Sequence, residues 1–354
     1  GANFLENWLS PVAYTRAYGE FRQGRPTRRG YLVVFEPRQS LTAGNADEWI
    51  PIRPGSEAIL AAVFNRLVAE ARGKPVSPAF SAVTVSAAAA ASGIAEEKIR
   101  TAAEWYATLK PAALTHGLGI EHSVNSMETL QAVFSLRAIT GNIDVKGGDV
   151  FPTPYPHVIH EQELELLDKL PPEQKKKQLG ADRFRLISRE GFEVTQQYVS
   201  KAWGKLALNR SSQFQCFAHA PTLYRAILTE KPYPVKGLIT LSSNPMVTQA
   251  NTKLVYQALK NLDLYVVVDF FMTPSAQLAD YVLPGTTYLE RPWLWAYAMI
   301  LGSERALPPV IPGKYERWSD YKFWKGLGDR LGQKEYWPWE DLEEVYDYRL
   351  APSG

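Results

Sequence analysis

The chain contains a single cysteine, Cys216, among its 354 residues. An intrachain disulfide needs two cysteines, and a cysteine-bound iron–sulfur cluster or Cys-based zinc site needs several, so this chain alone forms none of these. The neighbours of Cys216 are aromatic (FQCFAHAP), a setting typical of a small buried apolar residue. The cysteine count therefore excludes a disulfide scaffold.

Long apolar runs are also missing. No stretch reaches the ~18 uncharged apolar residues that a membrane-spanning helix requires, and no signal-peptide pattern opens the sequence. The hydrophobic content of 45% and charged content of 21% are those of an ordinary globular protein, and the net charge of +2 argues neither for nor against nucleic acid. The length suits two or three domains.

Short apolar runs alternate with segments of helical periodicity along most of the chain. This alternation predicts an α/β fold whose parallel sheets carry helices on their faces. Pro37 follows one such run and ends it, because proline donates no hydrogen bond to a strand ladder. We expect strands at residues 31–35, 112–114, 237–241 and 265–268, and helices at 11–24, 58–69, 95–109, 127–139 and 252–261, with a helix–loop–helix over 318–348.

Two of the predicted strands end in a carboxylate. Glu36 follows the apolar run 31–35, and Asp269 follows the run 265–268. A carboxylate at the carboxyl end of a parallel strand accepts hydrogen bonds from the ribose hydroxyls of a bound nucleotide. Taken alone, such a residue is more often a solvated loop carboxylate.

The segment Arg53-Pro54-Gly55-Ser56-Glu57 is a turn that leads into a predicted helix. Ser56 is a suitable N-cap residue, and Glu57 is favourably placed in the first helical turn. By itself Glu57 is therefore explained as a helix-stabilising charge.

Together these motifs resemble the molybdopterin oxidoreductase family, the group of dimethyl sulfoxide reductase, formate dehydrogenase and polysulfide or thiosulfate reductase. The strongest match is Asp269 followed by T-x-x-A-x-x-A-D-x-V-L-P and T-x-x-E, up to Glu290. Further matches are the opening Gly1-Ala2-Asn3 turn and the glycine-rich segments 116–122 and 141–149. The resemblance implies the central fragment of a catalytic subunit, cut directly after the first strand of its nucleotide-binding unit.

For the fold, the resemblance implies two Rossmann-like three-layer αβα units with mostly parallel sheets. We expect the first pterin-dinucleotide-binding unit at residues 1–118 and the second at 119–354. The charged excursion near 160–192 is either a solvated insertion or a docking surface for a partner subunit. The family's N-terminal [4Fe–4S] domain and its C-terminal barrel are expected to lie outside this chain.

For cofactors, the resemblance implies two molybdopterin guanine dinucleotides that hold one molybdenum or tungsten. In the family the acidic residue at the position of Glu57 accepts from the N1–H and N2–H groups of guanine, and the glycine turns approach the phosphates. No residue here is expected to ligate the metal or to act as acid, base or nucleophile. The expected cofactor-binding residues are Gly1, Asn3, Glu36, Arg38, Arg53, Gly55, Glu57, Gly117, Gly119, His122, Ser243, Asn244, Pro245, Asp269, Thr273 and Asp280.

For function, the resemblance implies a two-electron oxidoreductase acting on a small molecule such as a sulfur oxyanion or polysulfide, with this fragment inactive alone. An iron–sulfur electron-transfer subunit and a membrane-anchor subunit are the expected partners, without nucleic acid or direct membrane insertion. The expected location is the periplasm or the outer face of the cytoplasmic membrane.

Two alternatives remain at this stage. A cofactor-free structural subunit of a respiratory complex would agree with Glu36, Glu57 and Asp144, which replace the family's usual Asp, Asp and Gly. A nicotinamide dehydrogenase is disfavoured because no G-x-G-x-x-G motif opens a strand–helix unit.

Overall fold

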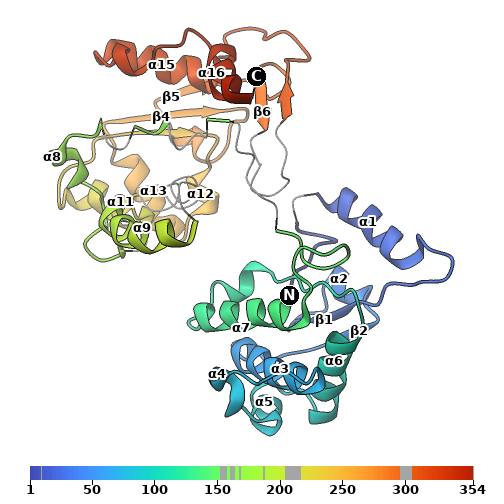
Figure 1. Ribbon diagram of the computed structural model, residues 1–354. Helices are drawn as coiled ribbons and strands as arrows, with labels where there is room; N and C mark the ends of the chain where they lie inside the picture. Colours follow the sequence, from blue (N-terminus) through green and yellow to red (C-terminus); the bar gives the residue numbers. More distant parts are fainter. Residues whose placement is uncertain are drawn as a thin grey trace. The chain divides into compact units, whose positions relative to one another are not determined.

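The computed structural model describes residues 1–8, 10–151, 158–159, 164–166, 169–185, 188–203, 217–295 and 305–353 (Figure 1). Cys216 and part of the excursion 160–192 lie outside these ranges. The chain forms two compact units, Gly1–Phe151 and Pro152–Gly354. The expected division at 118/119 differs from this one, because helix α7 (Ser126–Thr140) packs against α3 (Glu57–Ala71) within the first unit.

The first unit combines a small parallel sheet with several helices. Strands β1 and β2 pair in parallel, with Val34 opposite Trp49. The elements are α1 (Pro11–Gln23), β1 (Val33–Phe35), α2 (Leu41–Gly44), β2 (Glu48–Ile50), α3, α4 (Pro78–Ser81), α5 (Val85–Ser92), α6 (Glu96–Thr108), η1 (Leu118–Ile120) and α7.

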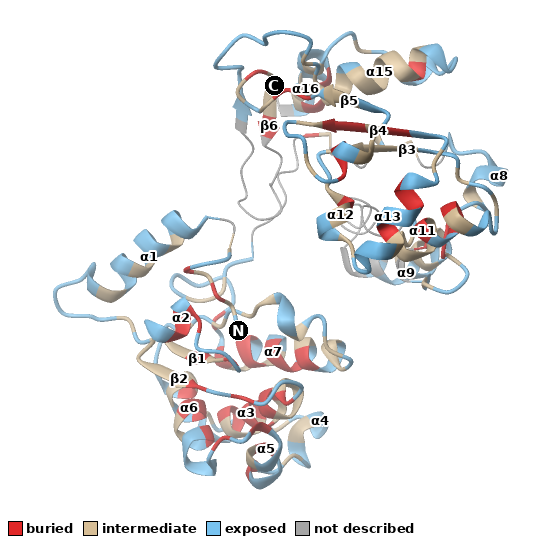
Figure 2. Cartoon of the chain, turned by 180° about the vertical axis from the view of Figure 1, so that it is seen from behind, coloured by how far each residue is buried: buried red, intermediate tan, exposed pale blue. Residues whose placement is uncertain are grey.

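The core of the first unit lies between α3, α5, α6 and the sheet. Val63 and Val68 of α3 and Ile99 of α6 are fully buried against Ile50 of β2. Figure 2 shows the buried residues on α3 and α7. The Asn65 side chain joins these two helices, because its Nδ2 donates to the carbonyl oxygens of Ala61 and Ala132 at 2.8 and 2.7 Å.

The strand expected at residues 112–114 does not form, so that prediction was wrong. Side chains take the backbone groups that a neighbouring strand would use. The Leu114 amide donates to both carboxylate oxygens of Asp149 at 3.1 and 3.2 Å, and its carbonyl accepts from Arg137 Nη2 at 2.6 Å. The segment is therefore held to the turn after α7 and to α7 itself.

The second unit contains a three-stranded parallel sheet in the order β3-β4-β5. Val266 of β4 lies between Ile239 of β3 and Tyr281 of β5. An antiparallel pair, β6 with β7, follows. The elements are α8 (Pro172–Lys175), α9 (Arg189–Trp203), α11 (Ala220–Thr229), β3 (Gly237–Leu241), α12 (Pro245–Thr248), α13 (Thr252–Lys260), β4 (Leu264–Asp269), η5 (Ala276–Leu278), β5 (Tyr281–Pro284), β6 (Trp293–Trp295), β7 (Arg305–Leu307), α15 (Asp320–Arg330), η6 (Lys334–Tyr336), α16 (Leu342–Leu350) and η7 (Ala351–Ser353).

Helices α11 and α13 cover one face of this sheet. Tyr265 and Val267 point to the same face, as alternate residues of a strand do, and are 1% and 0% exposed. Ile227 of α11 and Val255 of α13 pack against them. The mixed α/β class with parallel sheets is confirmed. No helix within the described ranges is long and apolar enough to cross a membrane.

Candidate functional site

Glu36 lies where β1 ends, at the carboxyl edge of the first sheet. It is only 5% exposed, and its Oε1 accepts from the Ser40 amide at 3.0 Å. The Gly1 amine donates to the Phe35 carbonyl at 2.9 Å, which holds residue 1 beside the strand end. A Cβ on Gly1 would stand 3.4 Å from Glu36 Oε2, so the turn formed by residues 1–3 lies within contact distance of the Glu36 carboxylate.

Asn3 supports this turn from inside. Its Oδ1 accepts from the hydroxyl and the amide of Thr42 at 2.9 and 3.3 Å, and its Nδ2 donates to Glu6 Oε2 at 2.6 Å. The side chain is 8% exposed. Its hydrogen bonds therefore serve to position Gly1 and Ala2 against β1.

The segment 116–119 lies directly against residue 1. A Cβ on Gly117 would stand 2.5 Å from the Gly1 carbonyl oxygen, a distance that only glycine permits. Burial lowers the pKa of the Gly1 amine, and the nearby carboxylates of Glu36 and Glu57 oppose that shift. Thus the structure brings Gly1, Glu36 and Gly117 into contact distance, with the Glu57 carboxylate near enough to act on the Gly1 amine, and we call these four residues the first half-site.

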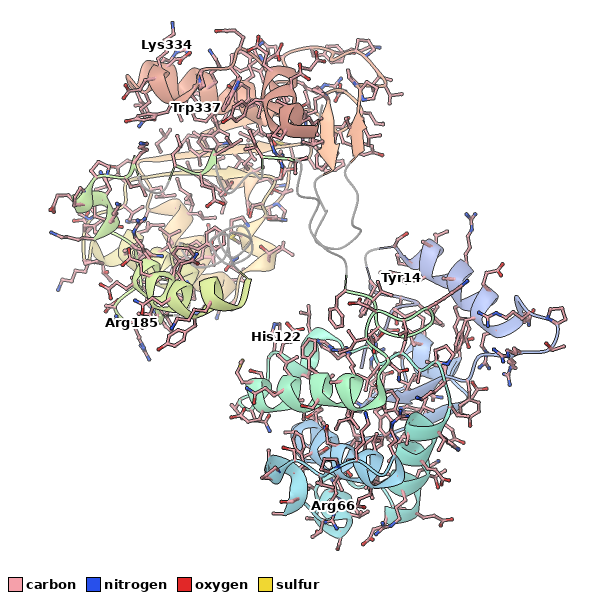
Figure 3. The ribbon with its side chains drawn as sticks, viewed as in Figure 1. Tyr14, Arg66, His122, Arg185, Lys334 and Trp337 are labelled. Carbon is pink, nitrogen blue, oxygen red and sulfur yellow. The ribbon has the colours of Figure 1, made fainter. Side chains whose placement is uncertain are left out.

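Other expected residues of this unit face elsewhere. Arg53 Nη1 donates to the Ala90 carbonyl at 2.8 Å, which ties it to α5. Arg38 is exposed and reaches Glu6 Oε2 only at 3.9 Å. His122 lies exposed between η1 and α7 (Figure 3). Gly119 is likewise exposed, with open space where a Cβ would stand.

The turn before α3 lacks the side-chain capping bond that was expected from Ser56. Gly55 has φ +88°, which explains a glycine in that position. The Ser56 hydroxyl donates to the Arg53 carbonyl at 2.6 Å and makes no capping bond to α3. The expected capping role of Ser56 was therefore wrong. Glu57 is the first residue of α3, as expected.

A charged cluster around the buried Arg137 lies next to the first half-site. Arg137 Nη2 is 3.1 Å from His116 Nδ1, Arg137 Nε is 3.5 Å from Asp149 Oδ2, and His116 Nε2 is 3.3 Å from Glu121 Oε1. Because arginine offers only donors, His116 Nδ1 must be the acceptor and Nε2 must carry the proton. Burial, reinforced by Arg137, lowers the pKa of His116, whereas Glu121 opposes the shift.

Burial also raises the pKa of Asp149, while the Leu114 amide, Arg137 and His116 act in the opposite direction. Sequence reasoning did not single out Arg137 or Asp149. The available signal was a charge on the apolar side of a predicted helix (LQAVFSLRAIT). Asp144, which replaces the family's glycine, has φ +53° and accepts from the Phe151 amide at 2.9 Å.

A second set of side chains lies at the carboxyl edge of the second sheet. Asp269 ends β4, and its Oδ1 accepts from the amides of Phe270 and Phe271 at 2.6 and 3.2 Å. Ser275, fully buried, donates to Asn244 Oδ1 at 2.7 Å and accepts from the Met246 amide at 3.0 Å. These bonds join the loops after β3 and β4.

Thr273 belongs to this set, since its Oγ1 accepts from the Ala276 amide at 3.2 Å and orders the loop after β4. Ser243 directly precedes Asn244 in sequence and is exposed. Pro245 is buried as the first residue of α12. Sequence reasoning missed Ser275. We call Asn244, Asp269, Thr273 and Ser275 the second half-site.

Asp280 lies at the opposite edge of the sheet. Its carboxylate accepts from the Tyr265 amide at 2.7 Å, and its own amide donates to the Tyr265 carbonyl at 2.9 Å. Tyr265 is near the start of β4 and Asp269 is at its end. The structure therefore does not bring Asp280 together with Asp269, and Asp280 instead aligns β4 with β5.

Each half-site offers a strand-end carboxylate and a close backbone turn at the carboxyl edge of a parallel sheet. This is the arrangement by which α/β proteins bind nucleotides, with the carboxylate accepting hydroxyl or base N–H donors. Within the described ranges, no group of three or more His, Cys, Asp or Glu side chains is arranged to hold a metal ion. The fold and the two half-sites together have the arrangement of α/β proteins that bind a cofactor at the carboxyl ends of parallel strands.

Comparison with known proteins makes the assignment specific. The model of the molybdopterin oxidoreductase family matches residues 1–330. The chain is 31% identical to acetylene hydratase of Syntrophotalea acetylenica over 91% of its own length and 46% of that protein. It is 28% identical to the thiosulfate reductase molybdopterin-containing subunit PhsA of Salmonella typhimurium, over 90% of this chain and 42% of PhsA. This chain belongs to the molybdopterin oxidoreductase family.

Structural similarity agrees with this membership. The solved structure of acetylene hydratase from Pelobacter acetylenicus matches with a TM-score of 0.77 and 30% identity, over 92% of this chain and 46% of that one. Formate dehydrogenase H of Escherichia coli is 26% identical over 89% of this chain and 43% of that protein. The chain thus spans less than half the length of these relatives. Its family membership implies a molybdopterin cofactor with molybdenum or tungsten.

Proposed function

We propose that this chain is the cofactor-binding α/β portion of the catalytic subunit of a molybdenum or tungsten enzyme. It would hold two molybdopterin guanine dinucleotides, one at each half-site. The chain alone would be inactive, and the family's [4Fe–4S] domain and C-terminal barrel would belong to the rest of the subunit. When bound, the cofactor supplies the metal and the redox chemistry.

The single observation that carries the proposal is the convergence of Gly1, Glu36, Glu57 and Gly117, which are separated by up to 116 positions in sequence. The carboxylates of Glu36 and Glu57 would accept hydrogen bonds from a nucleotide, because ribose hydroxyls and guanine N–H groups are donors. The glycines at positions 1 and 117 have no Cβ, so the backbone there can approach the nucleotide closely. Asp269 offers the same chemistry in the second unit. The residues of this chain would bind and orient the cofactor.

The substrate of the proposed enzyme is a small molecule. The relatives named above are a hydratase of acetylene, a thiosulfate reductase and a formate dehydrogenase, and what these names share is small substrate size. For a redox substrate we propose two-electron chemistry on a sulfur oxyanion or polysulfide. An iron–sulfur subunit and a membrane anchor would be the partners, in the periplasm or on the outer face of the cytoplasmic membrane.

Calorimetric titration of the chain with GDP, and with ADP as the control nucleotide, tests the proposal. Binding of GDP in preference to ADP is expected, since a carboxylate such as Glu57 accepts from the two N–H donors of guanine and adenine lacks that pair. The variant Glu57→Ala should lose GDP affinity in the first half-site. Asp269→Ala should do so in the second.

The same titration separates the proposal from a cofactor-free structural subunit. A scaffold would bind neither nucleotide, and Glu57→Ala would change nothing. The matched control is Glu70→Ala, because Glu70 lies exposed near the other end of α3 and pairs only with Arg66 at 2.8 Å. Detectable NADH binding in place of GDP binding would instead favour a nicotinamide dehydrogenase.

A further inference from the structure

A cleft of about 640 Å³ opens in the second unit. Its volume falls in the range of sites that hold small molecules. Its walls come from the turn before α8, from α8 and the residues after it, from the start of α9, and from the segments that precede α11 and β3. The lining residues are Leu170, Gln174, Lys175, Lys177, Gln178, Leu179, Arg189, Ala218, Tyr233 and Pro234.

The cleft lies at a different place in the fold from the second half-site. Tyr233 and Pro234 precede β3, so they approach the amino end of the parallel sheet. Asp269 ends β4 and Asn244 follows β3, so both lie at the carboxyl ends of these strands. A ligand in the cleft would therefore be distinct from a nucleotide at the second half-site.

The charge of the lining is one-sided. Among the described residues that line it are three cations, Lys175, Lys177 and Arg189, and no carboxylate. Two acidic side chains at its margin are engaged, since Glu193 lies 3.4 Å from Arg189 Nε and Glu173 accepts from Lys176 Nζ at 3.0 Å. Such a lining favours an anion.

Hydrogen bonds fix the walls of the cleft to one another. The Gln178 side chain accepts from the Arg189 amide at 2.9 Å and donates to the Phe217 carbonyl at 2.9 Å. The His219 amide donates to the Leu179 carbonyl at 2.9 Å, and the Tyr233 hydroxyl donates to the Lys177 carbonyl. These bonds join four segments distant in sequence, so the cleft is a built feature of the unit.

The remainder of the lining combines the polar side chains of Gln174 and Gln178 with an apolar wall. Leu179 is 5% exposed, and Leu170, Ala218, Pro234 and the Tyr233 ring add apolar surface. Burial raises the pKa of Tyr233, in agreement with a desolvated ring. We propose that the cleft binds a small organic anion in which a phosphate or carboxylate head group is joined to an apolar body. The head group would meet Lys175 and Lys177, and the body would cover the apolar wall.

Calorimetric titration of the whole chain with phenyl phosphate tests this proposal. Inorganic phosphate supplies the head group alone and phenol the body alone, so each should bind at least about tenfold more weakly, a difference of about 1.4 kcal/mol. Benzoate, used as a second ligand, tells whether a carboxylate head group serves as well. Phenyl phosphate should still bind in the presence of saturating GDP, which keeps this test independent of the proposed cofactor site.

The chain offers a matched pair of variants. The double variant Lys175→Gln/Lys177→Gln should weaken phenyl phosphate binding about tenfold. Lys176→Gln should not, because Lys176 lies between them, pairs with Glu173 and does not line the cleft. Ala218→Phe should also abolish binding by filling the space.

Several outcomes would overturn the proposal. Equal affinity for inorganic phosphate and phenyl phosphate would mean a cationic surface without a site for the body. Equal losses in Lys176→Gln and in the double variant would mean an unspecific charge effect. Binding of a pentaglutamate peptide without binding of phenyl phosphate or benzoate would mean a docking surface for an acidic protein segment.

Discussion

Gly117 stands directly against Gly1, so that a Cβ on Gly117 would come within 2.5 Å of the Gly1 carbonyl oxygen. This contact joins two glycine motifs that are 116 positions apart in the first unit and completes the first half-site. We predict that Gly117→Ala displaces residue 1 from Glu36 and weakens GDP binding about tenfold or more. Calorimetry with GDP measures this effect.

The control for this variant is Gly119→Ala, two residues away. A Cβ on Gly119 meets open space, so GDP affinity should be unchanged. Equal GDP affinities for Gly117→Ala and the unaltered chain would contradict the assigned contact.

Arg137 should be a determinant of the stability of the first unit. The residue is 5% exposed. Its guanidinium pairs with the Asp149 carboxylate and donates to the Leu114 carbonyl. We expect Arg137→Met to lower the free energy of unfolding by about 3 kcal/mol, because it leaves the half-buried Asp149 carboxylate without its cationic partner and the Leu114 carbonyl without its donor. Urea denaturation followed by circular dichroism gives the value.

The exposed Arg100 supplies the comparison, since it pairs with Glu96 only at 3.7 Å on the surface of α6. Arg100→Met should change the free energy of unfolding by less than about 0.5 kcal/mol. A loss for Arg137→Met that is no larger than this would show that the buried pair contributes nothing.

His116 gives a pH dependence whose sign is fixed by its environment. Burial and Arg137 lower its pKa below the ordinary 6.5, so the folded chain favours the neutral ring. The resulting stabilisation is present above pH 6.5 and is lost as the pH falls through the lower pKa of the folded state. The free energy of unfolding should therefore decline as the pH falls from 6.5 to the lower pKa of the folded state.

NMR titration of the His116 ring measures this pKa directly. Glu121→Gln should lower the pKa further, because the carboxylate is the group that opposes the shift. A rise of the pKa in this variant would refute the assigned pairing of His116 with Glu121.

Asp280 should contribute to stability and not to nucleotide binding. Its carboxylate accepts from the Tyr265 amide at 2.7 Å at the edge of the sheet opposite Asp269. We expect Asp280→Ala to lower the free energy of unfolding by about 1 kcal/mol, the contribution of one hydrogen bond, with GDP affinity retained. Thermal unfolding measures the stability and calorimetry with GDP measures the affinity of the same preparation. A loss of GDP affinity in the folded variant would show that Asp280 takes part in nucleotide binding.

The sequence was most reliable where a local pattern decided the structure. Short continuous apolar runs predicted β1, β3 and β4, and apolar residues at helical spacing predicted α3 and α7, because burial determines each element. The strand expected at 112–114 was wrong, because Arg137 and Asp149, distant in sequence, take the backbone groups of Leu114. Such long-range competition leaves no local signal.

The candidate site divides in the same way. Strand-end carboxylates such as Glu36 and Asp269 could be found from the run that precedes them. The separation of Asp280 from Asp269 was not predicted, because both belong to one contiguous motif of the sequence. Only strand register places them at opposite edges of the sheet.

The sequence by itself determined the family, the parallel α/β class and the motifs that carry acceptors and glycine turns, since these are written in short contiguous patterns. Tertiary structure alone decided which motifs meet. Gly117 reaches Gly1, Ser275 reaches Asn244, and the cations around Arg189 gather about an apolar cleft. The physical reason is that close packing and hydrogen bonding join groups by distance in space, which chain order does not specify.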